Sequence, residues 1–172
     1  MKWNFEQCME WLLIHEGGFV DDSRDPGGIT NLGVTKKVYT QWCMEQDYQP
    51  KDMRDLTPED VTPIYRANYW QAIAGDELSS GLDWCCFDFA VNAGPARSAR
   101  SIQTIVKVKA DGAIGKITLA AIASHDAASL IDALHDRRQR FYEKLKTFEH
   151  FGKGWTRRNQ ETKEQAHQLL NQ

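Results

Sequence analysis

The sequence predicts a mainly α-helical protein with one small β-hairpin or loop element, near residues 19–35. Through most of the chain, apolar residues recur at three- and four-residue steps, which is the period of an amphipathic helix. Several of these segments follow a capping residue and end at glycine or proline. Only residues 19–35 combine glycines, Pro26 and clustered aspartates with no helical period, and Ile29–Val34 is their most strand-like part.

The first helix is predicted to begin at Asn4, where Asn4–Gln7 resembles a capping box, and to end at His15 or Glu16. Gly17 is a natural helix stop because glycine adopts the left-handed conformation. Glu16 therefore belongs to the last turn of an apolar helix, on its packed side. The residues of that face are Phe5, Cys8, Met9, Leu12 and Glu16.

The remaining helices are predicted in order along the chain. Thr57 and Pro58 give the strongest start signal, a cap followed by proline at the first helical position. Gly94–Pro95 should end one helix and is a candidate boundary between regions 1–94 and 95–172, which we expect to pack together. The predicted helices span residues 35–43, 57–72, 83–93, 96–110, 118–123, 130–148 and 155–169.

The charge is distributed unevenly along the chain. The net charge of −3 argues against a nucleic-acid-binding protein. Residues 137–163, however, contain nine Lys and Arg but only three Asp and Glu, so this segment has a net charge of +6 and the rest of the chain has a net charge of −9. Such a segment is either a site for an anionic partner or a solvated helix face.

The cysteines and the N-terminal segment bear on where the protein is made. The four cysteines form no CxxC pair, which favours reduced, buried thiols and synthesis in a reducing compartment. Glu6 and Glu10 interrupt what would be the apolar part of a signal peptide. No stretch approaches the ~18 apolar residues of a membrane span, so we expect no stable membrane insertion.

Common catalytic and metal-binding motifs are not matched. A zinc-protease HExxH motif would need histidine where Phe19 stands, and a calcium loop would need glycine at Pro26 and glutamate at Leu32. Phosphate-cradling glycine loops and the GxSxG motif do not occur. We therefore expect neither a metal nor a cofactor.

Four carboxylates lie close together in sequence: Glu16, Asp21, Asp22 and Asp25. Cleavage of a glycosidic bond needs one carboxyl group that is still protonated, and a second, ionised carboxylate that stabilises the sugar cation or activates water. An apolar helix end disfavours a negative charge, as does the helix dipole, so Glu16 suits the first role. The polar aspartate-rich loop suits the second.

The run EGGFVDDSRDPGGITNLGVT, from Glu16 to Thr35, closely resembles the signature of glycoside hydrolase family 108. Members of this family are phage-type N-acetylmuramidases, so the resemblance implies a lysozyme-like fold. Phe87–Gly94 is similar to the family's second cleft-lining helix. Asp111–Gly115 and Phe151–Arg158 are similar to the helical peptidoglycan-binding lobe that usually follows.

The resemblance also implies roles for individual residues. Glu16 corresponds to the catalytic acid, and Asp25 and Thr30 to the later Asp and Thr of the motif. Asp25 follows Glu16 by nine residues, as in phage lysozymes, but Thr30 follows by fourteen rather than fifteen, which leaves its role open. The substrate-binding candidates, each with bracing or packing as the alternative, are Asp22, Asn31, Asp88, Asn92 and Trp155.

The function implied is hydrolysis of the MurNAc–GlcNAc β-1,4 bond of peptidoglycan glycan strands by a monomeric endolysin. Such an enzyme is made in the cytoplasm and reaches the wall in the periplasm after release by a holin. The alternatives are a lytic transglycosylase on the same scaffold, a host muramidase that assists secretion across the wall, and a wall-binding module without activity.

Overall fold

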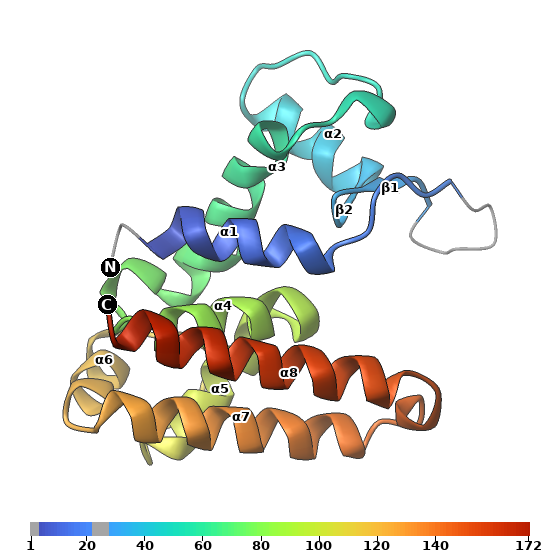
Figure 1. The fold of residues 1–172 in the computed structure, drawn as a ribbon. Helices are drawn as coiled ribbons and strands as arrows, with labels where there is room; N and C mark the ends of the chain where they lie inside the picture. Colours follow the sequence, from blue (N-terminus) through green and yellow to red (C-terminus); the bar gives the residue numbers. More distant parts are fainter. Residues whose placement is uncertain (1–3, 22–27) are drawn as a thin grey trace. The chain divides into compact units, whose positions relative to one another are not determined.

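The computed structural model describes residues 4–21 and 28–172. The fold is mainly α, as predicted, with one small sheet (Figure 1). In chain order the elements are α1 (Asn4–His15), β1 (Thr30–Asn31), β2 (Val34–Thr35), α2 (Lys36–Glu45), η1 (Met53–Asp55), α3 (Pro58–Tyr65), the π-helical turn η2 (Arg66–Trp70), η3 (Gln71–Ile73), η4 (Gly75–Glu77), α4 (Leu82–Ala93), α5 (Pro95–Ile105), α6 (Lys116–Ala123), α7 (Ala127–Glu143) and α8 (Phe148–Leu170).

The chain folds as two compact units. The smaller unit is Met9–Asn68, and the larger unit combines the segment up to Cys8 with Tyr69–Gln172. The boundary that the sequence suggests at Gly94–Pro95 lies inside the larger unit, where α4 packs against α5, α7 and α8. Helix α4, which ends at this boundary, therefore packs directly against helices that follow it in the sequence.

The smaller unit contains the β element, a hairpin of β1 and β2. The two strands pair antiparallel, with Thr30 opposite Thr35 and Asn31 opposite Val34. The turn residues Leu32 and Gly33 both have positive φ, at 49° and 72°. Two successive residues of this kind form the turn whose twist matches that of a hairpin.

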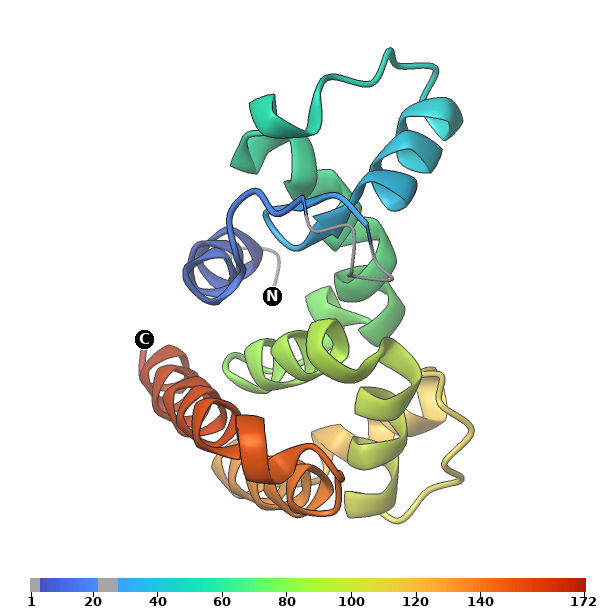
Figure 2. The same ribbon diagram turned by 90° about the vertical axis from the view of Figure 1, so that its right-hand side faces the viewer.

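Helices α2 and α3 of the smaller unit begin within one residue of their predicted starts. Figure 2 shows α2, in light blue, following the hairpin. The Thr35 hydroxyl accepts a hydrogen bond from Val38 N at the start of α2. Thr57 and Asp60 form a capping box at the start of α3, with Pro58 in the first helical position. These local interactions place α2 directly after the hairpin.

In the larger unit, α7 and α8 lie side by side along most of their length (Figure 1). Buried aromatic rings fill the space beside α4: the Phe5 and Trp70 centroids are 5.2 Å apart, and those of Trp70 and Phe87 are 5.4 Å apart. Asn4 does not simply cap α1, since its side-chain amide donates to Ser80 Oγ and Asp83 Oδ2. The first turn of α1 is thereby tied to the start of α4.

The structure corrects several predicted helix boundaries. The helix expected at 57–72 ends at Tyr65 and is followed by η2 and η3, and the helix expected at 155–169 begins at Phe148. The helix expected at 130–148 ends at Glu143, and a turn at 144–147 separates it from α8, which begins at Phe148. The helix expected at 96–110 ends at Ile105, followed by Lys107 with a φ of 59°. Within the described part of the chain no single helix has the length and apolar character to cross a membrane; the bent pair α6–α7 passes that test on length and composition alone.

Candidate active site

Glu16 lies immediately after α1, and its backbone N–H extends the helix by donating to Leu12 O at 3.2 Å. Its side chain is half-buried, while the following residues Gly17 and Gly18 are exposed. A Cβ atom at either glycine would meet no atom within 4 Å. The carboxyl is therefore anchored on a rigid helix and flanked by open backbone that a bulky substrate can approach.

The hairpin turn borders the Glu16 carboxyl. A Cβ atom built on Gly33 would lie 2.6 Å from Glu16 Oε2 and would also overlap the Tyr65 hydroxyl. The Tyr65 hydroxyl donates to the backbone carbonyl of Leu32 at 3.0 Å. Gly33 thus has two reasons to be glycine: its positive φ, and the space that the Glu16 and Tyr65 side chains occupy.

Thr30 and Asn31 hold the strand that leads into this turn. Thr30 exchanges backbone hydrogen bonds with Val20, of 2.8 and 2.9 Å, and its hydroxyl donates to Gly28 O at 3.4 Å. The Asn31 side chain is buried and donates to Met53 O at 2.7 Å. The observed contacts of Asn31 are those of a brace between the hairpin and η1.

The aspartate-rich loop is only partly described. Asp22, a substrate-binding candidate, and Asp25, the predicted second carboxylate, lie outside the described residues. The Asp21 carboxylate lies 4.0 Å from the Arg54 guanidinium, and the same guanidinium lies over the Phe19 ring, 4.9 Å from its centroid. The described part of the loop next to the Glu16 helix end is thus accompanied by an exposed cation from η1.

Asp88 has a different environment from the one expected for a substrate contact. Its carboxylate has no accessible surface and accepts from Arg138 Nη2 at 2.5 Å, Arg158 Nη2 at 2.7 Å and Thr162 Oγ1 at 3.2 Å. The two guanidinium groups outweigh the effect of burial and lower the pKa of Asp88 to about 2. This burial leaves no surface for a glycan to contact, so the structure gives Asp88 a bracing role instead.

Asn92 and Trp155 are also placed by the structure. Asn92 is exposed near the end of α4, and its amide donates to the backbone carbonyl of Asp88 at 2.9 Å. Trp155 is half-buried on α8, with its ring 5.4 Å from that of Tyr142 and 5.8 Å from that of the exposed Phe151. Asn92 and Trp155 keep accessible surface and belong to the larger unit, whereas Glu16 belongs to the smaller one.

Tyr65 is the site residue that sequence reasoning missed. Its spacing from Val61 and Ile64 marks it only as part of the packed face of α3, and its side chain is indeed buried. The contact of its hydroxyl with the hairpin joins positions 33 residues apart, which no local pattern reveals. Among the described residues no group of three His, Cys, Asp or Glu side chains is arranged to hold a metal ion.

A mainly α fold with a small hairpin beside a half-buried carboxyl at a helix end is consistent with a lysozyme-like fold. The family model "Glycosyl hydrolase 108" matches residues 9–94, and the model "Predicted Peptidoglycan domain" matches residues 97–160. The chain therefore belongs to glycosyl hydrolase family 108 and is a glycoside hydrolase that acts on peptidoglycan.

A solved structure is similar to this chain over its whole length. The chain is similar to Brucella abortus SagA, with 38% sequence identity and a TM-score of 0.86. The similarity covers 100% of this chain and 98% of the SagA chain. No curated protein matches the chain.

Proposed function

We propose that this protein is a muramidase that hydrolyses the MurNAc–GlcNAc β-1,4 bond, with Glu16 as the general acid. The observation that carries the proposal is the position of Glu16: half-buried at a helix end, against the hairpin, and next to two open glycines. A carboxyl group fixed by a helix and a turn keeps one orientation toward a bound glycan. Open backbone beside it leaves room for the sugar ring.

In the proposed reaction, Glu16 donates its proton to the glycosidic oxygen as the bond to the MurNAc anomeric carbon breaks. A water molecule then adds to the oxocarbenium-like sugar and returns a proton to the carboxylate. Asp25 is proposed as the second carboxylate, and Thr30 as a residue that orients the water, because both occupy the family motif. Asp22, Asn92 and Trp155 are kept as proposed substrate contacts.

The test is muropeptide analysis by mass spectrometry after digestion of purified peptidoglycan. We expect the parent protein to release fragments with a reducing-end MurNAc. Glu16→Gln should lower the rate by roughly a thousandfold, because an amide cannot donate the proton. Glu6→Gln, which neutralises an exposed glutamate on the same helix, is the matched control and should leave the rate unchanged.

Other products would change the assignment. Fragments that end in a 1,6-anhydro ring, one water lighter, would identify a lytic transglycosylase. A Glu16→Gln variant as active as the parent would remove Glu16 as the acid. A parent that sediments with the wall but releases nothing would identify a binding module.

We further propose that the enzyme is a phage or prophage endolysin, made in the cytoplasm and released to the periplasm by a holin. The resemblance of residues 16–35 to phage-type enzymes supports this setting, and the four buried free thiols are compatible with synthesis in a reducing compartment. Lysis of cells only when a holin is co-expressed would support it. Lysis without any holin, or passage of secreted cargo in place of lysis, would favour the host role.

A further inference from the structure

The basic C-terminal segment is not uniform in the structure, because some of its cations are already neutralised. Arg138 and Arg158 bind Asp88, Arg157 lies 3.8 Å from Glu161, and Lys163 lies 2.9 Å from Asp132. In contrast, Arg137, Arg140 and Lys144 form no ion pair within the described part of the chain. The segment's other cations without an ion pair among the described residues, Lys146 and Lys153, lie beyond α7, so three of its uncompensated cations gather on α7 and at its C-terminal end.

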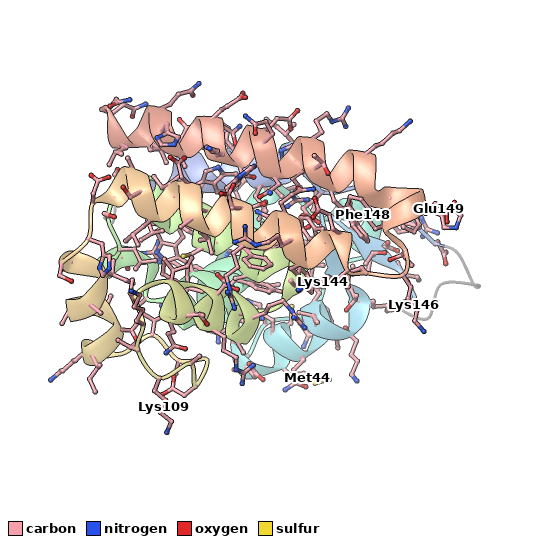
Figure 3. The ribbon with its side chains drawn as sticks, turned by 90° about the horizontal axis from the view of Figure 1, so that it is seen from below. Met44, Lys109, Lys144, Lys146, Phe148 and Glu149 are labelled. Carbon is pink, nitrogen blue, oxygen red and sulfur yellow. The ribbon has the colours of Figure 1, made fainter. Side chains whose placement is uncertain are left out.

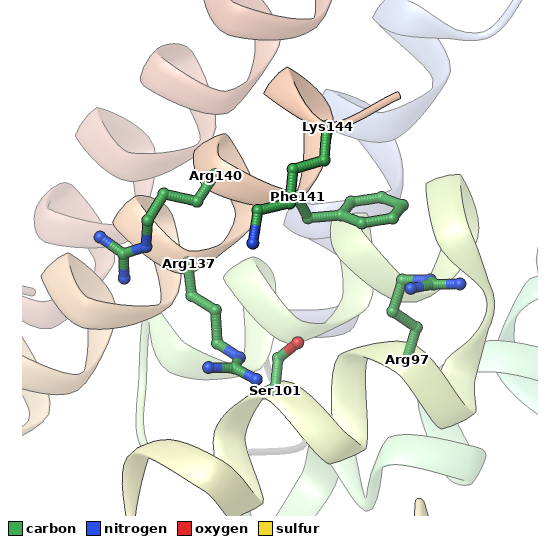
Figure 4. A pocket seen from close by; sticks show the side chains of 6 residues that line it. All are labelled: Arg97, Ser101, Arg137, Arg140, Phe141 and Lys144. Atoms are coloured by element: carbon green, nitrogen blue, oxygen red, sulfur yellow. The ribbon is translucent and has the colours of Figure 1, made fainter. Parts of the chain in front are cut away.

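These cations share one face of α7 and border a cavity of about 220 Å³ between α7 and α5 (Figure 4). Residues at steps of three, four and seven lie on one helix face, so the arrangement follows from the sequence spacing. Helix α5 contributes Arg97, whose guanidinium lies 4.3 Å from the centroid of the Phe141 ring. The residues that line the cavity are Arg97, Ser101, Arg137, Arg140, Phe141 and Lys144.

A second hollow of about 450 Å³ shares Arg97, Ser101 and Arg137 with the first and adds Arg100 from α5. Helix α5 carries no acidic residue along its length. Like charges placed this close repel one another, so the groove formed by the two hollows is more favourable when an anion occupies it. We call this surface the basic groove.

We infer that the basic groove binds the free carboxylates of peptidoglycan stem peptides, an inference that rests on peptidoglycan being the substrate. Guanidinium groups match carboxylates with two parallel hydrogen bonds, and Ser101 offers a hydroxyl beside them. The Phe141 ring supplies the apolar surface that aliphatic stem side chains need.

The position of the groove in the chain supports the same partner. All six residues of the smaller hollow lie within residues 97–160, the segment that matches the predicted peptidoglycan domain. The stem peptides are the part of peptidoglycan that carries free carboxylates along every strand. The groove would therefore read the peptide component, while the proposed chemistry acts on the sugar component.

The first test is calorimetric binding of a synthetic stem tetrapeptide, L-Ala-γ-D-Glu-meso-diaminopimelate-D-Ala, to the full chain. We expect the amidated peptide to bind about tenfold more weakly than the free acid, and the Arg137→Gln/Arg140→Gln variant to show a similar loss with the free acid. The control is Lys109→Gln/Lys116→Gln, which removes the same charge from exposed positions outside the groove. Figure 3 shows Lys109 on the loop before α6, away from Lys144 at the end of α7.

The second test separates this inference from the proposed hydrolysis. With intact sacculi, the Arg137→Gln/Arg140→Gln variant should show a KM raised about tenfold and an unchanged kcat. With glycan strands stripped of peptides by an amidase, variant and parent should be equal. A parent that binds the tetrapeptide but cleaves neither substrate would contradict the hydrolysis and leave the groove assignment intact.

Three results would overturn the inference. These are equal binding of the free and amidated peptides, an unaltered affinity in the arginine variant, or binding of inorganic phosphate and phosphatidylglycerol vesicles without binding of the tetrapeptide. The last result would assign the groove to phosphate groups instead. Thermal unfolding of each variant checks that the substitutions leave the fold intact.

Discussion

Glu16 and Asp88 are both carboxylates that the sequence marks as site residues, yet the two units of the molecule surround them differently. Glu16 in the smaller unit is half-buried and borders a hairpin turn and exposed glycines. Asp88 in the larger unit has no accessible surface and is held by Arg138, Arg158 and Thr162. The residue type is similar, but the neighbours determine what each group can do.

The comparison shows why Asp88 does not suit acid catalysis. A general acid must carry a proton at working pH and must reach the leaving oxygen. The arginines keep Asp88 ionised by lowering its pKa to about 2, and its burial separates it from any ligand. The Asp88 carboxylate on α4 instead binds Arg138 of α7 and Arg158 of α8, so its charge stabilises the packing of these three helices.

The largest effect on stability is expected from Asp88→Asn. The change leaves Arg138 buried beside a neutral amide, and removing one partner of a buried ion pair costs about 3–5 kcal/mol of unfolding free energy. Urea unfolding measures it. Asp132→Asn is the control, because Asp132 pairs with Lys163 at the exposed surface, where such pairs contribute about 0–1 kcal/mol.

Equal losses in these two variants would show that the Asp88 pairs are not the brace described here. The hydrolytic rate of Asp88→Asn, expressed per folded molecule, is a second measurement. This rate should be close to that of the parent, since Asp88 takes no part in the proposed proton transfer. A folded Asp88→Asn variant without hydrolytic activity would show that Asp88 takes part in catalysis.

The second effect is a dependence of stability on acid. The pKa of Asp88 is about 2 in the folded protein, whereas an aspartate in an unfolded chain has a pKa near 3.8. The ionised carboxylate therefore contributes its full stabilisation at pH values above 3.8. This stabilisation is lost as the pH falls toward 2, by about 2 kcal/mol. Unfolding free energies of the parent and Asp88→Asn, measured from neutral pH downward, should converge by this amount; parallel curves would contradict it.

The two units also differ in how far the sequence predicts them. Local rules placed the helix start at Thr57 and Pro58, the end of the first helix at His15 or Glu16, and the strand-like piece that forms the hairpin. Local rules did not predict the role of a residue when side chains distant in sequence determine it. The arginines that bind Asp88 lie 50 and 70 residues away, so helical spacing alone could not distinguish a brace from a substrate contact.

A similar limit explains the break between α7 and α8. Leu145 and Phe148 continue the apolar stripe of α7, which predicted one helix through residue 148. The chain instead turns at 144–147, and α8 then packs along α7. The gain from packing two helices against each other outweighs the local period, and only the tertiary structure reveals it.

The third effect concerns the space that Gly33 leaves for Glu16. Gly33→Ala forces an L residue to a φ of 72° and inserts a methyl group where Glu16 and Tyr65 lie. We expect a loss of about 1–2 kcal/mol in unfolding free energy and a roughly tenfold lower hydrolytic rate, because the carboxyl is displaced.

Gly28→Ala is the matched control, since Gly28 has a φ of 67° and no atom within 4 Å of a Cβ. It shares the backbone strain but not the displacement, so it should lose stability of about 1 kcal/mol and keep its activity. If both variants lose activity to the same degree, the space beside Gly33 is not what positions Glu16.

The smallest effect is expected from Tyr65→Phe, which removes one hydroxyl and keeps the packed ring. The Leu32 carbonyl loses its 3.0 Å hydrogen bond, at a cost of about 1 kcal/mol of unfolding free energy. Because the same hydroxyl borders the position of the Glu16 carboxyl, the hydrolytic rate should fall as well.

The control is Tyr39→Phe, which removes a hydroxyl that accepts a longer, 3.4 Å hydrogen bond from Lys51 N, away from the hairpin turn. That control should lose less stability and no activity. Equal rates for the two variants would reduce Tyr65 to a packing residue and leave the hairpin backbone alone to orient the acid.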